Sequence, residues 1–381
     1  MARWPAVLAV ALAATACGGG SPTPSTAPSA APTDTVAPSP TASQASTSTS
    51  TPMPTPAPGT FSATGSMAVA RTGGAATRLE DGSVLVVGGN PGPAEIYDPA
   101  TGRFSITGTP TNEYADPLAV MVQGGRVLVV GGADGTRAEI YEPATGLFTS
   151  TGSTSVPRDG ATATLLLSGL VLIAGGNDAK GTFKSAETYD AATGKSSPTG
   201  SMTTARTCFA ATRLKDGRVL VAGGVKGEAS DASAEIYDPA SGKFSATGSM
   251  GTARACPTAT LLANGRVLVA GGSSERGTWE TSAELYDPAT GKFIPTGAMS
   301  IGRWAHTATL LDSGRVLVAG GSDGGDDIAT AEIYDPATGK FNATGSMTVG
   351  RSLQTATLLG DGRVLIAGGN HSGTSAELYR P

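Results

Sequence analysis

The chain has 381 residues, a formal net charge of −5 and only 15% charged residues, whereas glycine occurs 54 times. No block of basic residues stands out, which excludes the strongly cationic surface of a typical nucleic-acid-binding protein. A low charge content with abundant glycine, alanine, threonine and valine favours a fold of short strands and tight turns.

The first segment, residues 1–17, predicts export. A single early charge at Arg3 precedes an apolar run over residues 5–16, which is too short to cross a bilayer and has the length of a signal-peptide core. The small residues before Cys17 resemble the lipobox of bacterial lipoproteins, and that resemblance implies a lipid on Cys17. Because Ala14 replaces the usual leucine, an ordinary secretory signal is the alternative. Either signal exports the protein, to the outer face of a bacterial membrane or into the medium.

Residues 18–59 form a second segment that consists almost entirely of serine, threonine, proline, alanine and glycine. Such a composition cannot bury enough apolar surface to fold. We therefore expect a disordered tether that separates a folded domain from the membrane anchor.

Residues 60–381 are a repeat. A string close to DGRVLVAGG recurs in seven copies, at spacings of 43 to 49 residues, and each copy is followed by a variable stretch and a strand-like AEIYDP. A period of this length indicates a repeat architecture. The glycine pairs begin at Gly88, Gly131, Gly175, Gly223, Gly271, Gly320 and Gly368.

Each repeat predicts four antiparallel strands. In the sixth copy they are expected at residues 303–311, 315–321, 331–335 and 340–345, and the turn motifs DSG and PATG separate the first pair and the last pair. No stretch has a sustained helical period. Seven such units predict an all-β protein, a seven-bladed β-propeller.

The two ends of the repeat region predict how the ring closes. The last copy stops at AELYRP and lacks a fourth strand, whereas an extra fourth strand, residues 60–67, precedes the first copy. The N-terminal strand can therefore complete the last blade, and no open sheet edge remains.

The repeat resembles the Kelch family, in which a strand ends in Gly-Gly and a Glu-x-Tyr-Asp strand follows about ten residues later. The resemblance covers residues 60–381 and implies a Kelch β-propeller similar to the central domain of galactose oxidase. One departure is that the tryptophan usual near the fourth strand is replaced. Its place is taken by Phe104, Phe148, Phe244, Phe293, Phe341 and, in the third copy, Ser196.

The strand order predicts which face of the propeller carries function. The turns between the first and second strands and between the third and fourth strands share one face and hardly vary. The loops between the second and third strands share the other face with the links between blades, and these loops differ in every copy. Binding residues usually lie in such loops, so we expect function on this face.

An arginine opens the first strand in six copies, and Tyr114 holds that position in the second copy. These arginines could ring the mouth of the central channel and bind an anion or an acidic peptide. The alternative is an ion pair with the glutamate that begins each third strand, because unpaired arginines would repel each other. The arginines are Arg71, Arg158, Arg206, Arg254, Arg303 and Arg351.

Aromatic and imidazole side chains concentrate in the last three copies. Stacking rings beside polar groups are typical of sugar and peptide sites, although local packing explains them equally simply. A metal site built from the two histidines and an aspartate is only weakly indicated, so we predict neither a metal nor another cofactor. The candidate ligand-binding residues are Trp279, Arg303, Trp304, His306, Asp326, Asp327 and His371.

Cys208 and Cys256 occupy the same position in consecutive copies. An exported protein can form disulfides. Equivalent Cα atoms on neighbouring inner strands should lie roughly 7–9 Å apart, somewhat beyond the 4.4–6.8 Å that disulfides prefer. The sequence therefore leaves two interpretations open, a bridge between blades and two buried thiols.

These patterns favour a non-enzymatic binding module, a monomer that presents its loop face to a protein, peptide or glycan at the cell surface. The resemblance to galactose oxidase raises an enzymatic alternative. That copper-radical chemistry requires two tyrosines, two histidines and a cysteine cross-linked to one of the tyrosines. Seven of the eight tyrosines here lie in the repeated Glu-x-Tyr strand, where packing explains them. A structural spacer in the cell envelope is a further alternative.

Overall fold

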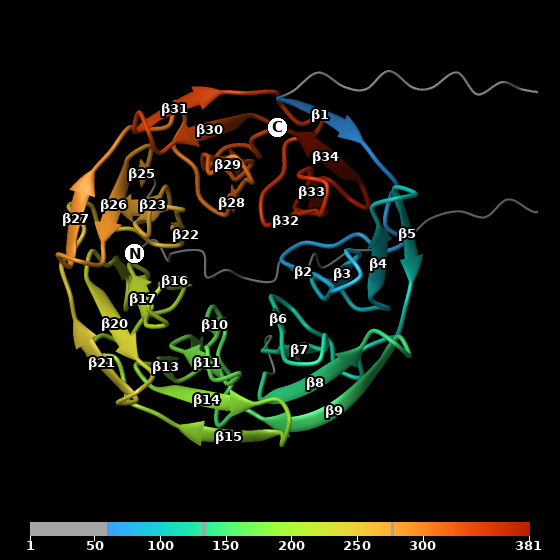
Figure 1. The fold of residues 1–381 in the computed structure, drawn as a ribbon, viewed down its shortest axis with the longest axis horizontal. Coiled ribbons are helices and arrows are strands. Elements are labelled where there is room, and N and C mark those ends of the chain that lie inside the picture. Colours follow the sequence, from blue (N-terminus) through green and yellow to red (C-terminus); the bar gives the residue numbers. More distant parts are fainter. Residues whose placement is uncertain (1–58, 132–134, 276–277) are drawn as a thin grey trace, which may run out of the picture. The chain divides into compact units, whose positions relative to one another are not determined.

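The computed structural model describes residues 59–131, 135–275 and 278–381, which form seven four-stranded antiparallel sheets. The predicted signal peptide, the lipidation of Cys17 and the tether up to residue 58 lie outside the described residues. The sheets are arranged as the blades of a propeller around a central axis, as Figure 1 shows. The predicted all-β, seven-bladed propeller is confirmed.

Each blade runs from an inner strand at the axis to an outer strand at the rim. The inner strands are β2 (Ala75–Arg78), β6 (Leu118–Met121), β10 (Thr162–Leu165), β16 (Ala210–Arg213), β22 (Thr258–Leu261), β28 (Thr307–Leu310) and β32 (Thr355–Leu358). The second strands are β3 (Val84–Val87), β7 (Val127–Val130), β11 (Val171–Ala174), β17 (Val219–Ala222), β23 (Val267–Ala270), β29 (Val316–Ala319) and β33 (Val364–Ala367). The third strands are β4 (Glu95–Asp98), β8 (Arg137–Glu142), β14 (Ala186–Asp190), β20 (Ala234–Asp238), β26 (Ala283–Asp287), β30 (Ala331–Asp335) and β34 (Ala376–Arg380). The outer strands are β5 (Arg103–Ile106), β9 (Leu147–Ser153), β15 (Lys195–Pro198), β21 (Lys243–Ala246), β27 (Lys292–Pro295), β31 (Lys340–Ala343) and β1 (Thr60–Ala63).

The second strands form the core of every blade. All four residues of each are buried, because both faces of the sheet pack against neighbouring blades. This burial explains why these strands read as unbroken runs of valine, leucine, isoleucine and alanine instead of alternating with polar residues. Each inner strand contacts the inner strands of both adjacent blades, so the contacts run around the whole ring.

The Glu-x-Tyr tyrosines connect neighbouring blades. Each tyrosine ring is buried, and its hydroxyl hydrogen-bonds a threonine near or just after the end of the outer strand of the preceding blade, at 2.8–3.3 Å. In most blades the ring also contacts the phenylalanine of the outer strand, with centroids 4.8–4.9 Å apart. The threonine of each TG motif therefore forms a hydrogen-bonded pair with the tyrosine of the AEIYD motif in the next blade.

The N-terminal strand closes the ring. β1 pairs antiparallel with β34 and places Phe61 opposite Tyr379, so it supplies the fourth strand that the last copy lacks. Phe61 packs on Tyr379 as the other phenylalanines pack on their tyrosines. Gly59 N–H donates to the carbonyl of Arg380 at 2.6 Å. The predicted closure is confirmed.

The sequence did not predict three short hairpins in the variable loops of the third, fourth and fifth blades. They pair β12 (Asn177–Asp178) with β13 (Gly181–Thr182), β18 (Val225–Lys226) with β19 (Ala229–Ser230), and β24 (Ser273–Glu275) with β25 (Thr278–Trp279). Strands of two or three residues are too short for a readable alternation of apolar and polar residues. Across the described ranges, no helix is long and apolar enough to span a membrane.

Candidate binding face

The two faces of the propeller are built differently. The turn face is formed by the turns between the first and second strands and between the third and fourth strands of each blade. In the latter turns an aspartate carboxylate accepts a hydrogen bond from the backbone N–H two residues further on, as Asp98 does from Ala100 and Asp335 from Ala337. The loop face consists of the variable loops and the links that enter the inner strands. There, short β-bridges join each hairpin to its own blade's link, such as Thr207 with Val225. The turn face thus repeats one motif, and the loop face carries the differences between blades.

The six repeated arginines are buried and paired. Each is at most 3% exposed, and a guanidinium nitrogen lies 2.8–3.3 Å from the third-strand glutamate of the same blade. Burial lowers the pKa of Arg71, Arg254, Arg303 and Arg351, against the opposing effect of the paired carboxylate. Arginine nevertheless stays protonated in proteins. The geometry is that of the ion-pair alternative and leaves these six guanidiniums inside the blades.

The second copy differs from the other six. Tyr114 takes the place of the arginine, is 3% exposed, and packs in the core between the first two blades. The glutamate of this blade, Glu139, is fully buried and accepts hydrogen bonds from the backbone N–H and hydroxyl of Thr111 with one carboxylate oxygen. Its other oxygen, Oε2, has no hydrogen-bond partner among the described residues.

Trp279 and Trp304 lie together on the loop face. Their rings are stacked, with centroids 5.7 Å apart and planes inclined by 20°, and both side chains are half-buried. Gly324 and Gly302 lie against Trp279, since a Cβ atom at either glycine would come within 2.1 Å of its indole nitrogen or backbone oxygen. The predicted aromatic cluster is therefore a contact between the loops of the fifth and sixth blades, with part of each ring at the surface.

The other candidates in these blades divide between surface and interior. His371 is 76% exposed, and its Nδ1 lies 2.9 Å from an Asp327 carboxylate oxygen. Asp326 is exposed in the same sixth-blade loop. Arg303 is buried, and so is His306, whose Nε2 lies 3.1 Å from the hydroxyl of Thr258 and whose pKa burial lowers to about 3.

These positions separate the two histidines. Among the described residues, no group of three or more histidine, cysteine, aspartate or glutamate side chains is placed to hold a metal ion. Arg303 and His306 face the interior, whereas Trp279, Trp304, Asp326 and His371 reach the loop face; the Asp327 side chain, paired with His371, is 8% exposed.

Cys208 and Cys256 form a disulfide, with Cα atoms 4.7 Å apart. The separation expected from the inner strands was too large. Both cysteines precede their strands in links with a left-handed backbone, φ 50°, and the N–H of Cys256 donates to the carbonyl of Cys208 at 2.7 Å. This hydrogen bond joins the two links directly. Equivalent residues in the other blades have the same conformation: Gly73, Asp116, Gly160, Ala305 and Leu353.

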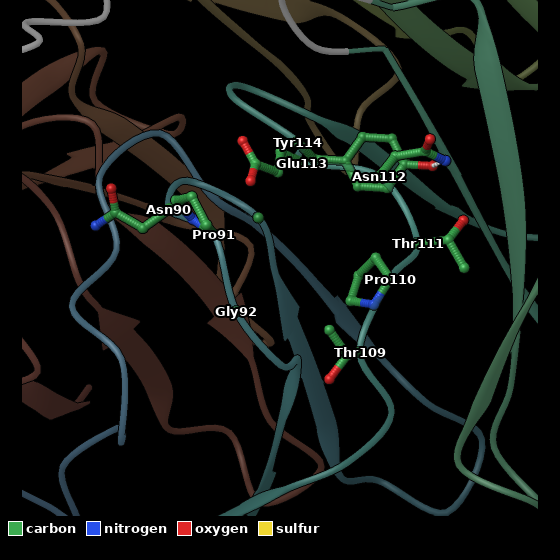
Figure 2. Close-up of a pocket in the computed structure, with 10 residues that line it drawn as sticks. Asn90, Pro91, Gly92, Thr109, Pro110, Thr111, Asn112, Glu113 and Tyr114 are labelled. Carbon is green, nitrogen blue, oxygen red and sulfur yellow. Dashed lines mark hydrogen bonds between the residues drawn. The ribbon is translucent and has the colours of Figure 1, made fainter.

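A pocket of about 210 Å³ opens on the loop face between the first two blades. Figure 2 shows Asn90, Pro91 and Gly92 of the first variable loop on one side and the link of residues 109–114 on the other. None of these residues was predicted as a binding residue. One feature of the sequence could have pointed to them: the second copy has Tyr114 where the other six have an arginine, and Tyr114 lines this pocket.

The copper-radical group implied by galactose oxidase does not fit the described residues. Both cysteines of the propeller are joined to each other, so neither can be cross-linked to a tyrosine. One histidine is buried against Thr258, and the other is paired with Asp327. Seven tyrosines are engaged by threonines in contacts between blades. We therefore derive no oxidation step through such a group.

Comparisons with known proteins agree with this fold. The chain has the architecture of a seven-bladed β-propeller, and the family model for the Kelch motif matches residues 206–251 and 303–348. No curated protein sequence is significantly similar to the chain. A solved structure of a fungal alcohol oxidase of the AA5 family, in complex with copper, is similar with a TM-score of 0.72 and 19% identity, over 84% of this chain and 76% of that chain. At this identity the likeness concerns the fold alone.

Proposed function

We propose that this protein is a non-enzymatic binding module that presents the loop face of its propeller to a protein, peptide or glycan outside the cell. The observation that carries the proposal is the contrast between the faces. The turn face repeats one hydrogen-bonded motif, whereas the three extra hairpins, the tryptophan pair and the pocket all lie on the loop face. A rigid scaffold with variable loops on one face is the usual arrangement of binding proteins.

The predicted export segment gives this function its location. In the proposal, residues 1–17 direct export, Cys17 carries a lipid, and residues 18–59 hold the propeller away from the membrane. The variant Cys17→Ser should move the protein from the membrane fraction to the medium or the soluble fraction. Mass spectrometry of the N-terminal peptide should find acyl chains on Cys17; an unmodified Cys17 would favour the ordinary secretory signal.

The tryptophan pair supplies the first surface to test. The stacked, half-buried indoles offer apolar area, and Asp327 and His371 offer polar groups on the same face, a combination that suits a sugar ring or a peptide. A glycan array and a pull-down with the full chain would identify candidate ligands. Binding should weaken at least about tenfold in Trp279→Ala or Trp304→Ala if an indole is an anchor residue.

Leu167→Ala is the matched control, because Leu167 is 71% exposed in a turn on the opposite face. It should leave binding unchanged. If the tryptophan variants lose thermal stability and keep their ligand, the pair only packs the loops together, and the binding site lies elsewhere on the face.

The enzymatic alternative is an oxidase of the galactose oxidase type. Its support is the fold likeness to the AA5 alcohol oxidase, which at 19% identity carries no function. Copper measured in the purified protein, together with hydrogen peroxide formed from primary alcohols, would establish the oxidase and overturn the proposal. A structural spacer in the cell envelope would show neither a ligand nor this activity.

A further inference from the structure

The second blade contains a buried carboxylate that lacks its usual cation. In the six other blades, the third-strand glutamate accepts a backbone N–H from the link and also pairs with the arginine, as Glu235 does with Thr203 and Arg206. Glu139 keeps the link contact through Thr111 but has Tyr114 in place of the arginine. A buried carboxylate oxygen without a partner is unfavourable. The missing group, by comparison with the other blades, is a guanidinium.

The pocket of Figure 2 lies beside this carboxylate. Two of its lining residues connect it to Glu139: Thr111 donates two hydrogen bonds to Glu139, and Tyr114 holds the vacated arginine position. Burial is the main cause that raises the pKa of Tyr114, and the charge of Glu139 and hydrogen bonding between the two side chains raise it further, so Tyr114 lies against the carboxylate without supplying a cation.

The lining residues of the pocket carry one charge, the exposed carboxylate of Glu113. They also include the amides of Asn90 and Asn112, but no lysine or arginine. Arg137 approaches from β8, and its guanidinium donates to Asn112 Oδ1 at 3.0 Å. The volume of about 210 Å³ is below the ~300–1,000 Å³ of pockets for drug-sized ligands, so it suits a single side chain.

We propose that the pocket between the first two blades binds the cationic side chain of an arginine or lysine from a peptide or protein partner. Glu113 meets the cation at the rim, and Glu139 attracts it from beneath Thr111 and Tyr114. The partner thus supplies the positive charge that the other six blades provide from their own chain. This inference rests on the proposed binding function and specifies one site and one ligand class for it.

The first test uses blocked arginine, Nα-acetyl-arginine-methylamide, and its neutral isostere, the corresponding citrulline derivative. Saturation-transfer NMR and titration with the full chain should show that the arginine probe binds at least about tenfold more tightly, since the citrulline derivative has no positive charge and carries a carbonyl oxygen in place of one NH2 donor. Equal binding of both probes, or no binding of the arginine probe, would overturn the proposal. Ligands found by the glycan array or pull-down would then still support the binding function at another site.

Tyr114→Arg is the most informative variant, because it restores the arginine of the other blades. The new guanidinium should pair with Glu139, abolish binding of the arginine probe, and raise the denaturation midpoint. Tyr114→Phe is the matched control: it removes the hydroxyl, adds no charge, and should keep the binding. If Tyr114→Arg binds the probe as well as the parent protein does, the site does not depend on Glu139 and the proposal fails.

Two glutamate substitutions keep the test valid if Tyr114→Arg does not fold. Glu113→Gln changes an exposed residue, so it should fold normally and bind the arginine probe about tenfold more weakly. Glu139→Gln should also weaken binding of the probe, and it should leave the stability of the fold unchanged or raise it. Glu235→Gln breaks the ion pair with Arg206, so it should lower the stability. Equal loss of stability in Glu139→Gln and Glu235→Gln would show that Glu139 already has a cationic partner within the chain, and would contradict the proposal.

Discussion

In the six blades that carry the arginine, the glycine pair makes one hydrogen bond within its own blade and one with the next blade. The carbonyl of the first glycine accepts Nη1 of its own blade's arginine, as Gly320 does from Arg303 at 2.9 Å. The N–H of the second glycine donates to a carbonyl of the next blade, that of Arg351 for Gly321 and that of Tyr114 for Gly89, both at 2.9 Å. Both glycines have positive φ. The pair is therefore a structural junction, and the loop face begins after it.

Replacement of the first glycine tests this junction. In Gly320→Ala, the new Cβ would lie 2.5 Å from the Arg351 carbonyl oxygen, at φ +66°. Gly314→Ala is the matched control, with φ +79° and no atom within 4 Å, so it measures the backbone strain alone, about 1–2 kcal/mol. Gly320→Ala should lose about 1–3 kcal/mol more in chemical denaturation, as overpacked sites do. Equal losses would contradict a steric role for the pair.

His306 makes the stability of the protein depend on pH. Its pKa is about 3 in the folded chain and about 6.5 when unfolded, so acid protonates the unfolded state first. The stabilising contribution is complete above pH ~6.5 and is lost as the pH falls towards 3, at up to about 1.4 kcal/mol per pH unit. His306→Gln should remove this loss, because Gln354 occupies the same position in the next blade and bonds the Ala319 carbonyl. If the unfolding free energies of the parent protein and of His306→Gln change equally with pH between pH 4 and 6.5, His306 is not buried.

At the scale of elements, the disulfide joins two links that belong to different blades. Cys208 and Cys256 are separated by 48 positions, so the bridge encloses the whole fourth blade and the entry to the fifth. The loop-entropy relation gives a stabilisation of about 4 kcal/mol for a loop of this length. The bridge therefore holds two blades at the axis, whereas the tyrosine–threonine contacts hold them near the rim.

The double variant Cys208→Ala/Cys256→Ala should unfold at a lower denaturant concentration, by about 4 kcal/mol in the unfolding free energy. Cys17→Ala is the control and should not change the propeller's stability. Peptide mapping without reductant should recover the two cysteines in one linked fragment. Two free thiols in that map would show that the bridge does not form in the protein.

At the scale of the whole molecule, most of the scaffold could be predicted from the sequence. The four strands of each repeat, the closure by residues 60–67 and the assignment of the two faces all follow from the period and from strand order. The hairpins could not be predicted, because β12, β18 and β24 are too short to carry a pattern. The Cys208–Cys256 distance depends on a left-handed link, and nothing at those two positions marks that conformation.

The candidate site was harder to predict than the scaffold. Trp279 and Trp304 were grouped correctly in space, but their sequence does not reveal that the rings stack on each other. Arg303 and His306 are polar residues whose burial follows only from the packing of the next blade. The pocket beside Tyr114 was missed because its residues are ordinary, and only the absence of an arginine there marks it.

Ring closure makes a prediction for the whole molecule. Deletion of residues 1–66 removes β1, so the outer edge of β34 loses its partner and the contact of Phe61 with Tyr379. An unpaired strand edge promotes aggregation. This variant should melt earlier and form oligomers in size-exclusion chromatography. Deletion of residues 1–58 is the control and should stay monomeric; equal behaviour of both variants would mean that β1 does not close the ring.

We propose that the ligand binds on the loop face, and hydrogen-exchange mass spectrometry can locate the binding surface directly. The full chain would be compared with and without the ligand identified by the glycan array or the pull-down. Protection should appear in peptides from the variable loops and links, such as residues 88–94, 109–116 and 322–328, with the turn face unchanged. Protection centred on the turns, such as residues 98–103 and 335–340, would contradict the proposed binding face.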